Sequence, residues 1–153
     1  MTVTTAFPTL IDRIVTRLQA ASSLSGVRIF DGAEVDFSYP KDAVAIGHDG
    51  SIGESDIQAG SINDDPLNFG DDHIESGVIN CSLWAQDGST DLKVRRTRAF
   101  QLLSAVDTAI RTDATFSGAC FYAILSSSTV RYEQTPQGSA VVIDFNISYQ
   151  AQS

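Results

Sequence analysis

The stretch HIESGVINCSLWAQDGSTDLKVRRTRAFQLLSAVDTAI (residues 73–110) contains two hydrophobic periods in succession. Over 73–86 the chain alternates, which predicts a long strand with one apolar face made of Ile79, Cys81, Leu83 and Ala85. From Leu92 to Ile110 apolar residues recur every three or four positions, which predicts an amphipathic helix. The polar turn signal at 87–90 separates the two patterns. A strand, a turn and a helix therefore form the centre of the predicted fold.

Upstream of this stretch, the chain predicts a helix and two short strands. Pro8 suits a first helical turn, and one apolar face follows it at Leu10, Ile11, Ile14, Val15, Leu18 and Ala21. The sequence SSLSG (22–26) ends this helix. The apolar runs VRIF (27–30) and AVAIG (43–47) then predict two buried strands.

Downstream of the second helix, three segments predict strands. They are GACFYAIL (118–125), TVRYEQ (129–134) and SAVVIDFNISYQ (139–150). The last two flank the turn signal at 135–138, which predicts a hairpin. In the final segment Val141, Ile143, Phe145, Ile147 and Tyr149 share one face, and Asp144, Asn146 and Ser148 share the other, so we expect one buried face and one face in water.

The predicted order is one helix, three strands, a second helix and three more strands. Strands and helices do not alternate one by one, which excludes a doubly wound parallel sheet. The order favours an α+β fold with a mostly antiparallel sheet, both helices on one face, and a long C-terminal β-hairpin. The length of 153 residues and the apolar content of 42% are typical of one globular domain, spanning 1–153.

The negative charge is concentrated in one part of the chain. Between Asp31 and Glu75 there are twelve acidic residues and one base, while the whole chain has a formal charge of -9. Within this part, residues 48–72 follow no hydrophobic period and predict a long, acidic, flexible loop. Such a distribution argues against a cationic groove for nucleic acid. It suits contact with a basic protein surface, or solubility alone.

The chain has few candidates for catalytic chemistry. The nucleophile pattern G-x-S-x-G is absent, and His48 and His73 are the only histidines. These two would converge only if the strands beside them are neighbours. Gly47, Gly50 and Gly53 follow a strand, but no helical pattern follows them to bind a phosphate. We therefore expect no catalytic residues, no cofactor and no enzymatic activity.

Oxygen ligands for a hard cation occur in the acidic loop. Asp64, Asp65, Asp71 and Asp72 lie close together, but their spacing does not match an EF-hand. We interpret them as a solvated acidic surface, and a small divalent-metal-binding module or enzyme remains the alternative. Cys81 and Cys120 lie in apolar runs and are interpreted as buried thiols. No segment has the roughly 20 apolar residues of a membrane helix, and the first residues lack a secretory pattern.

Basic residues are concentrated at the start of the second helix. Lys93, Arg95, Arg96 and Arg98 are four of the ten bases in the chain. Cations at this position oppose the helix dipole, so a compensating interaction is expected. Asp87, Asp91 and other local carboxylates can supply it. Alternatively, the cluster binds the acidic region of a neighbouring copy or a partner, and a head-to-tail contact of that kind can close into a ring.

The arrangement as a whole resembles the tail terminator (tail completion) proteins of long-tailed bacteriophages and related phage-like particles. It comprises an N-terminal helix, a short strand, AVAIG (43–47), an acidic loop, a strand ending in LWAQDG (83–88), a helix and a terminal hairpin. The best local match is residues 79–110, where a strand with tryptophan near its end leads through a polar turn into an amphipathic helix.

The resemblance implies a structural virion protein without catalytic residues. Such proteins form a ring, typically a hexamer, that caps the tail tube and joins it to the head-tail connector or stopper protein. DNA would pass through the lumen without specific binding, and the protein would reside in the virion after assembly in the host cytoplasm. Another ring component of the neck or tail tube is the alternative within the same class. The interface residues that this reading favours are the basic cluster and the four aspartates named above.

Overall fold

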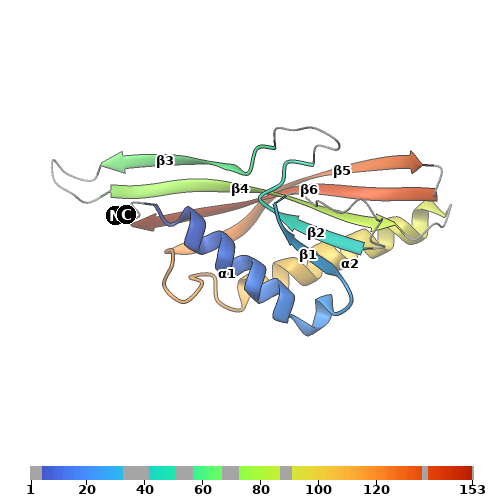
Figure 1. Ribbon diagram of the computed structural model, residues 1–153, viewed down its shortest axis with the longest axis horizontal. Helices are drawn as coiled ribbons and strands as arrows, with labels where there is room; N and C mark the ends of the chain where they lie inside the picture. The colour runs from blue at the N-terminus through green and yellow to red at the C-terminus, as the bar shows by residue number, and fades with distance from the viewer. Residues whose placement is uncertain are drawn as a thin grey trace.

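The computed structural model describes residues 5–32, 42–50, 57–66, 73–86, 91–135 and 138–152. Figure 1 shows the order of its elements along the chain. They are α1 (Phe7–Ala20), a short 3-10 helix η1 (Ser22–Leu24), β1 (Arg28–Asp31), β2 (Asp42–Ile46), β3 (Gly60–Pro66), β4 (His73–Gln86), α2 (Leu92–Arg111), β5 (Tyr122–Thr135) and β6 (Gly138–Gln152).

The six strands form one sheet in the order β1-β2-β4-β6-β5, and β3 pairs with β4 beside this path. All neighbours are antiparallel except β1 and β2, which are parallel. The predicted C-terminal hairpin is confirmed, because β5 and β6 pair along their length from Thr135 opposite Gly138. The α+β prediction with a mostly antiparallel sheet is thus confirmed.

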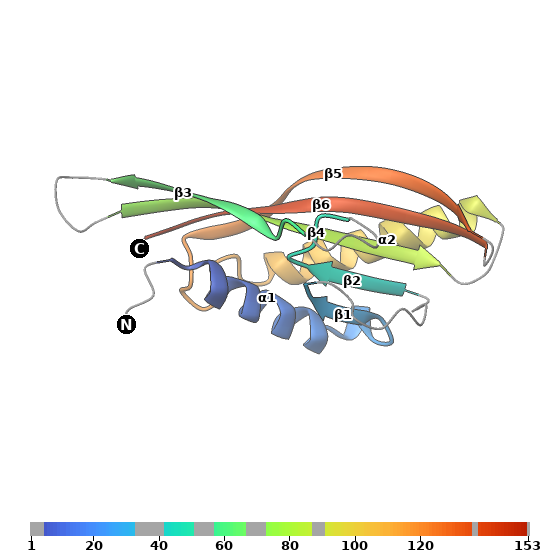
Figure 2. The same cartoon turned by 45° about the horizontal axis from the view of Figure 1, so that its top comes forward.

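Strand β4 is the centre of the sheet. One of its edges pairs with β6 from Ile74 to Gln86. The other edge is shared, since β3 pairs with its first half and β2 with residues 81–85 (Figure 2). The two halves meet at Asn80. The sheet therefore extends toward β1 at one end of β4 and toward β3 at the other end.

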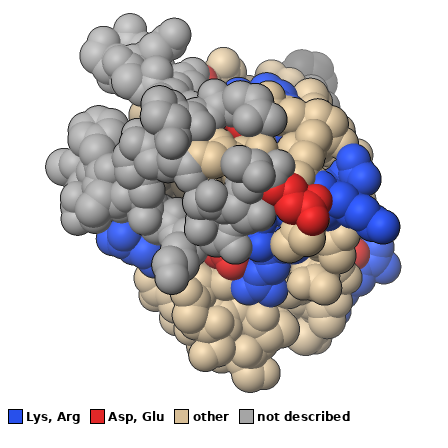
Figure 3. Space-filling model, turned by 90° about the vertical axis from the view of Figure 1, so that its right-hand side faces the viewer, with Lys and Arg blue, Asp and Glu red and all other residues tan. Residues whose placement is uncertain are grey.

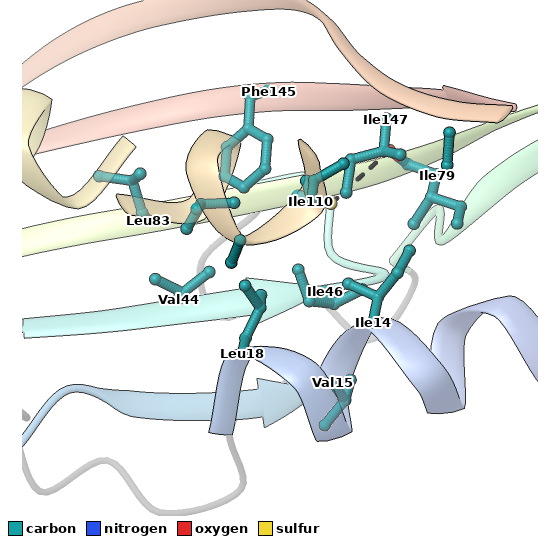
Figure 4. Close-up of a cluster of buried hydrophobic side chains, with 14 of the residues drawn as sticks. Ile14, Val15, Leu18, Val44, Ile46, Ile79, Leu83, Ile110, Phe145 and Ile147 are labelled. Atoms are coloured by element: carbon teal, nitrogen blue, oxygen red, sulfur yellow. Dashed lines mark hydrogen bonds between the residues drawn. The ribbon is translucent and has the colours of Figure 1, made fainter. Parts of the chain in front are cut away.

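Both helices cover the same face of the sheet, as predicted (Figures 1 and 2). Figure 4 shows the resulting core, with Leu18 of α1 and Ile110 of α2 directed at β-strand residues such as Ile46 and Phe145. The predicted apolar faces of both helices are buried here. We call the opposite face of the sheet, which carries Trp84, the outer face. None of the described helices combines the length and the apolar character needed to cross a membrane.

Two predictions about strands are wrong. Residues 60–66, expected to be irregular, form β3. Their sequence GSINDDP has no alternating pattern of its own, and the backbone ladder with β4 is what holds them extended. The segments predicted as separate strands at 118–125 and 129–134 form the single strand β5. Serine residues interrupt the apolar pattern there, where a β-bulge lies between Leu125 and Ser127.

The N-terminus of α1 is capped from the sheet. Its own N-cap residue, Ala6, has no side-chain oxygen. The buried carboxylate of Glu75 on β4 instead accepts hydrogen bonds from the Ala6 backbone N–H (3.1 Å) and the Thr5 hydroxyl (2.9 Å). It also accepts one from the Tyr149 hydroxyl on β6. A carboxylate at this end suits the positive end of the helix dipole.

Candidate interaction interface

The basic end of the molecule is the start of α2. Asp91 is the N-cap residue of this helix, and its side chain accepts from the backbone N–H groups of Lys93 (3.1 Å) and Val94 (3.4 Å). The Asp91 carboxylate therefore offsets part of the positive charge that gathers at this helix end.

The four predicted basic residues do not share one surface, because each successive residue turns about 100° around the helix. Arg95 is buried, with 7% of its surface exposed. Arg98 forms an ion pair with Asp42 of β2 (Nε to Oδ2, 2.9 Å). Lys93 and Arg96 remain exposed, and Arg96 donates a hydrogen bond to the Tyr132 hydroxyl (3.3 Å). Figure 3 views this end of the molecule and shows Lys and Arg side chains at several places on it, with Asp and Glu side chains between them.

The predicted acidic residues lie elsewhere. Asp64 is an exposed residue of β3, and Asp65 follows it in the strand, opposite Ile74. Asp71 and Asp72 lie outside the described residues. In Figure 1, β3 and the start of β4 occupy the end of the long axis opposite the start of α2. The structure therefore does not bring Asp64 together with Lys93 and Arg96 within one subunit.

The described residues offer no ready site for a metal or for histidine chemistry. Within them, no three His, Cys, Asp or Glu side chains are grouped so that they could hold a metal ion. His48 lies beside Trp84, with their rings 5.5 Å apart, whereas His73 opens β4 opposite Pro66. These positions are separated by about ten residues of strand, or roughly 30 Å. The two histidines do not converge.

The outer face carries a charged network that was not predicted from the sequence. Arg131 of β5 donates to both carboxylate oxygens of Asp144 (Nε to Oδ2, 2.8 Å) and to Glu133 (3.1 Å). Ser82 donates to the same Asp144 carboxylate (2.9 Å). Hydrogen bonding by Asp144 raises the pKa of Arg131. The hairpin register would have found this network, because it sets Arg131 opposite Val142, diagonal to Asp144.

The chain that follows β2 is held against this network. Arg131 donates to the Gly50 carbonyl oxygen (3.2 Å), and the Gly50 N–H donates to Nδ1 of His48 (2.8 Å). Gly50 has a φ of 86°, and a Cβ there would lie 2.2 Å from the Asp144 carboxylate. Glycine is therefore required for this close approach. The glycine pattern at 47–53 thus reflects, at Gly50, contact with the protein's own side chains.

His48 is a buried residue, with 5% of its surface exposed. Desolvation by burial lowers its pKa below the ordinary value of 6.5, although the nearby carboxylates of Asp49 and Asp144 act in the opposite direction. The neutral imidazole also accepts the Gly50 hydrogen bond at Nδ1, which a protonated ring cannot do. His48 therefore holds the chain in place as a neutral residue.

One residue, Asn80 of β4, binds the chain both just after β2 and just before β3. The Asn80 carbonyl oxygen accepts from the N–H groups of Gly47 (2.7 Å) and His48 (2.9 Å). Its own N–H donates to the Ala59 carbonyl oxygen (2.8 Å). Its side-chain amide donates to the Gln58 carbonyl oxygen (3.0 Å). Asn80 lies where β2 and β3 meet along β4.

Exposed apolar side chains, also missed from the sequence, are concentrated along β5. Of the large apolar residues exposed in the described part of the chain, most lie on this strand or beside it: Phe121, Tyr122, Ile124, Val130 and Tyr132. Ile62 of β3 and Phe100 and Val94 of α2 complete the set. The sequence pattern alone could not reveal this exposure, because it depends on β5 being the last strand of the sheet.

The two cysteines are buried, as predicted, and neither is bonded to the other. Burial raises the pKa of Cys81 to about 12 and that of Cys120 to about 11. Both thiols are therefore protonated and poorly nucleophilic at neutral pH.

Comparison with known proteins finds similarity in structure but not in sequence. No protein-family model matches the chain, and no curated protein is similar to it in sequence. Among solved structures, the fold is similar to a chain of the virion of a native gene transfer agent particle, with a TM-score of 0.41 and 11% sequence identity. The match covers 94% of this chain and 95% of that chain.

Proposed function

We propose that this chain is a non-enzymatic structural protein of a phage or phage-like particle, and specifically its tail terminator. In this role it forms a ring that closes the tail tube and joins it to the head-tail connector. Its place is the virion, after assembly in the host cytoplasm. The sequence resemblance supports the proposal, and the elements that carry it are present as α1, β1, β2, β4, α2 and the β5–β6 hairpin.

The observation that carries the proposal is the charge difference between the two ends of an elongated subunit. Lys93 and Arg96 are exposed at the start of α2, at one end of the long axis, and Asp64 is exposed in β3, which reaches the other end (Figure 1). Copies that stand side by side in a ring would present a basic end on one face of the ring and an acidic end on the other. A joining ring needs two faces that select different partners.

The basic end is proposed to bind a partner component, either the tube or the connector. The other members of the predicted cluster point into the subunit: Arg95 is buried, and Arg98 pairs with Asp42. A second copy bound end to end through Lys93 and Arg96 is the competing arrangement. The two arrangements differ in what a charge reversal at these positions would disrupt.

The test combines native mass measurement, negative-stain imaging and a tube-binding assay. The wild-type protein is expected to form a closed oligomer with a central hole and to cap purified tail tubes. The variant Lys93→Glu/Arg96→Glu is expected to keep the closed oligomer and to lose joining to tube or connector. A control, Arg111→Glu, makes the same kind of charge change at the far end of α2, where only an exposed pair with Asp107 is lost.

Each outcome bears on a different part of the proposal. Loss of the oligomer in the double variant alone would favour the end-to-end arrangement and would contradict partner binding at the basic end. Wild-type protein that neither closes into a ring nor caps tubes would overturn the assignment as a tail terminator. A defect in Arg111→Glu equal to that of the double variant would show a general charge effect.

A further inference from the structure

Strand β5 ends the sheet with an edge that is open in the described part of the chain. It pairs with β6 along one edge, and no described strand pairs with its other edge. Natural edge strands are usually short or protected by charge. This strand spans 14 residues, and no charged residue occurs from Phe121 to Val130. The edge is therefore long and poorly protected against pairing with another strand.

Apolar side chains are exposed on both faces of β5. Ile124, which is 48% exposed, pairs with Ser148 on the outer face. Val130, which is 39% exposed, pairs with Ile143 on the helix-covered face. A partner that docks on one face would cover only one of these residues. A further strand beside β5 would cover both, and it would also satisfy the open backbone groups.

The strand at the opposite edge of the same sheet, β3, has the direction and position along the sheet that pairing with β5 requires. Strands β3 and β5 run in opposite directions, because β4 and β6 lie between them and each pairing is antiparallel. In a second copy related by rotation about an axis along the strands, β3 therefore meets β5 as an antiparallel neighbour. One row across the sheet joins the two edges, through Ser61, Val78, Ser148 and Ile124.

Charge and apolar character agree with this pairing. Ile62 of β3 is 44% exposed on the helix-covered face. When β3 of one copy lies beside β5 of another, Ile62 contacts that strand. Asp64, two residues after Ile62, is exposed on the same face. It lies in the row of the sheet next to the one that contains Tyr122, the first residue of β5. There the exposed Arg13 of α1 donates to the carbonyl oxygens of Phe116 (2.7 Å) and Ser117 (3.3 Å). An aspartate brought to this point would meet a guanidinium.

We infer that β5 of one copy pairs with β3 of a second copy, so that the sheet continues from subunit to subunit. The occupant of the open edge is thus another copy of this chain. The inference rests on the proposed ring and adds which surfaces close it. It leaves Lys93 and Arg96 at the basic end free for another component, whereas Asp64 at the other end faces Arg13 of the neighbouring copy.

Disulfide trapping tests the pairing with the variant Ser61→Cys/Ile124→Cys. Within one subunit these residues are three strand spacings apart, roughly 14 Å, which no disulfide can span. Any cross-link between them therefore joins two copies. Mild oxidation is expected to give a ladder of covalent oligomers in a denaturing gel, ending at the size of the closed ring. The native thiols of Cys81 and Cys120 are buried, so wild-type protein is expected to stay uncross-linked.

The control variant Ile62→Cys/Ile124→Cys places its thiols on opposite faces of the continued sheet and is expected to give no ladder. A second measurement does not depend on disulfide geometry: Ile124→Lys should lower self-association at least tenfold, and Thr108→Lys on α2 should not. Thermal unfolding of each variant checks that it folds.

A closed wild-type oligomer without the Ser61–Ile124 ladder would overturn the pairing and leave the proposed function standing. A ladder without closed rings in the images would support the pairing and count against the terminator. Cross-linking of Ile124→Cys alone would show that two β5 strands meet, which overturns the pairing. Protein that stays monomeric at every concentration, with no ladder, would overturn it too.

Discussion

Glu75 is the residue on which the junction between helix and sheet depends most. Its buried carboxylate accepts hydrogen bonds from Thr5, from Ala6 and from Tyr149, so it connects β4 to both α1 and β6. Burial of a carboxylate is tolerated only when its oxygens are bonded in this way. Sequence alone gave no sign of this role, because Glu75 stands among the other acids of the 31–75 segment.

Replacement of Glu75 tests this role. Glu75→Ala should lower the free energy of unfolding by about 2–4 kcal/mol, since it leaves the buried Tyr149 hydroxyl without its acceptor. Glu75→Gln keeps the shape and one acceptor oxygen, so it should cost about half as much. Urea unfolding, followed by the fluorescence of the single tryptophan, Trp84, measures both. An equal loss in the two variants would argue against hydrogen bonding as the cause.

His48 should make stability depend on pH. Its pKa is lowered in the folded state by burial, so the unfolded state binds the proton more readily. Where the unfolded state binds more protons, stability rises with pH. The free energy of unfolding should therefore be steady above about pH 7 and should fall as the pH drops through the unfolded value of 6.5.

The slope of the free energy of unfolding against pH is the quantity to measure. His48→Asn removes the titrating ring and keeps an acceptor that can reach the Gly50 N–H. The variant should lose the part of the slope that begins near the unfolded value of 6.5 and extends below it, whatever its absolute stability. Urea unfolding at several pH values gives the slope. A slope equal to that of the wild type would show that another group carries the dependence.

At the scale of elements, the start of α2 can be tested without touching the core. Asp91→Ala should cost about 1 kcal/mol of stability, because the N–H groups of Lys93 and Val94 lose their cap. Asp91→Asn keeps a good capping oxygen and removes the charge. Its cost should be smaller, a few tenths of a kcal/mol, and should shrink with added salt. Chemical denaturation of both variants at two salt concentrations separates cap from charge.

The elements predicted well are those whose pattern is long and decided by their own residues. Strand β4 was predicted with its observed bounds, and α1, α2 and β6 were predicted to within a few residues. Strand β3 was missed because its extended shape comes from pairing with β4 and not from an alternating pattern of its own. The basic cluster at the start of the helix was predicted, but not that Arg95 is buried or that Arg98 pairs with Asp42. The hydrophobic and charge patterns of a sequence do not show which residues far apart in the chain, such as Asp42 and Arg98, will meet in the fold.

At the scale of the whole molecule, assembly should depend little on salt. The inferred contact between copies consists mainly of backbone hydrogen bonds and apolar side chains, with one charge pair. Such contacts persist when ionic screening shortens from about 10 Å at 0.1 M salt to about 3 Å at 1 M. The oligomer measured by native mass or sedimentation should therefore survive in 1 M salt.

Binding of the basic end to its partner should weaken over the same range. The proposed contact would rely on the exposed charges of Lys93 and Arg96, which salt screens. Dissociation of the oligomer by salt, with tube binding unchanged, would reverse the two assignments and would indicate that charge holds the copies together.

The hydrogen bonds at Asn80 have a consequence for variation in this protein. The excursion between β2 and β3 leaves and rejoins the sheet at one residue, so its two ends are fixed a short distance apart. An insertion between residues 50 and 57 should therefore cost little, because the entropy of closing a loop rises by only about 0.6 kcal/mol for each doubling of its length. A peptide inserted there should therefore be displayed without unfolding the sheet, and chains of this fold should tolerate different lengths at this point.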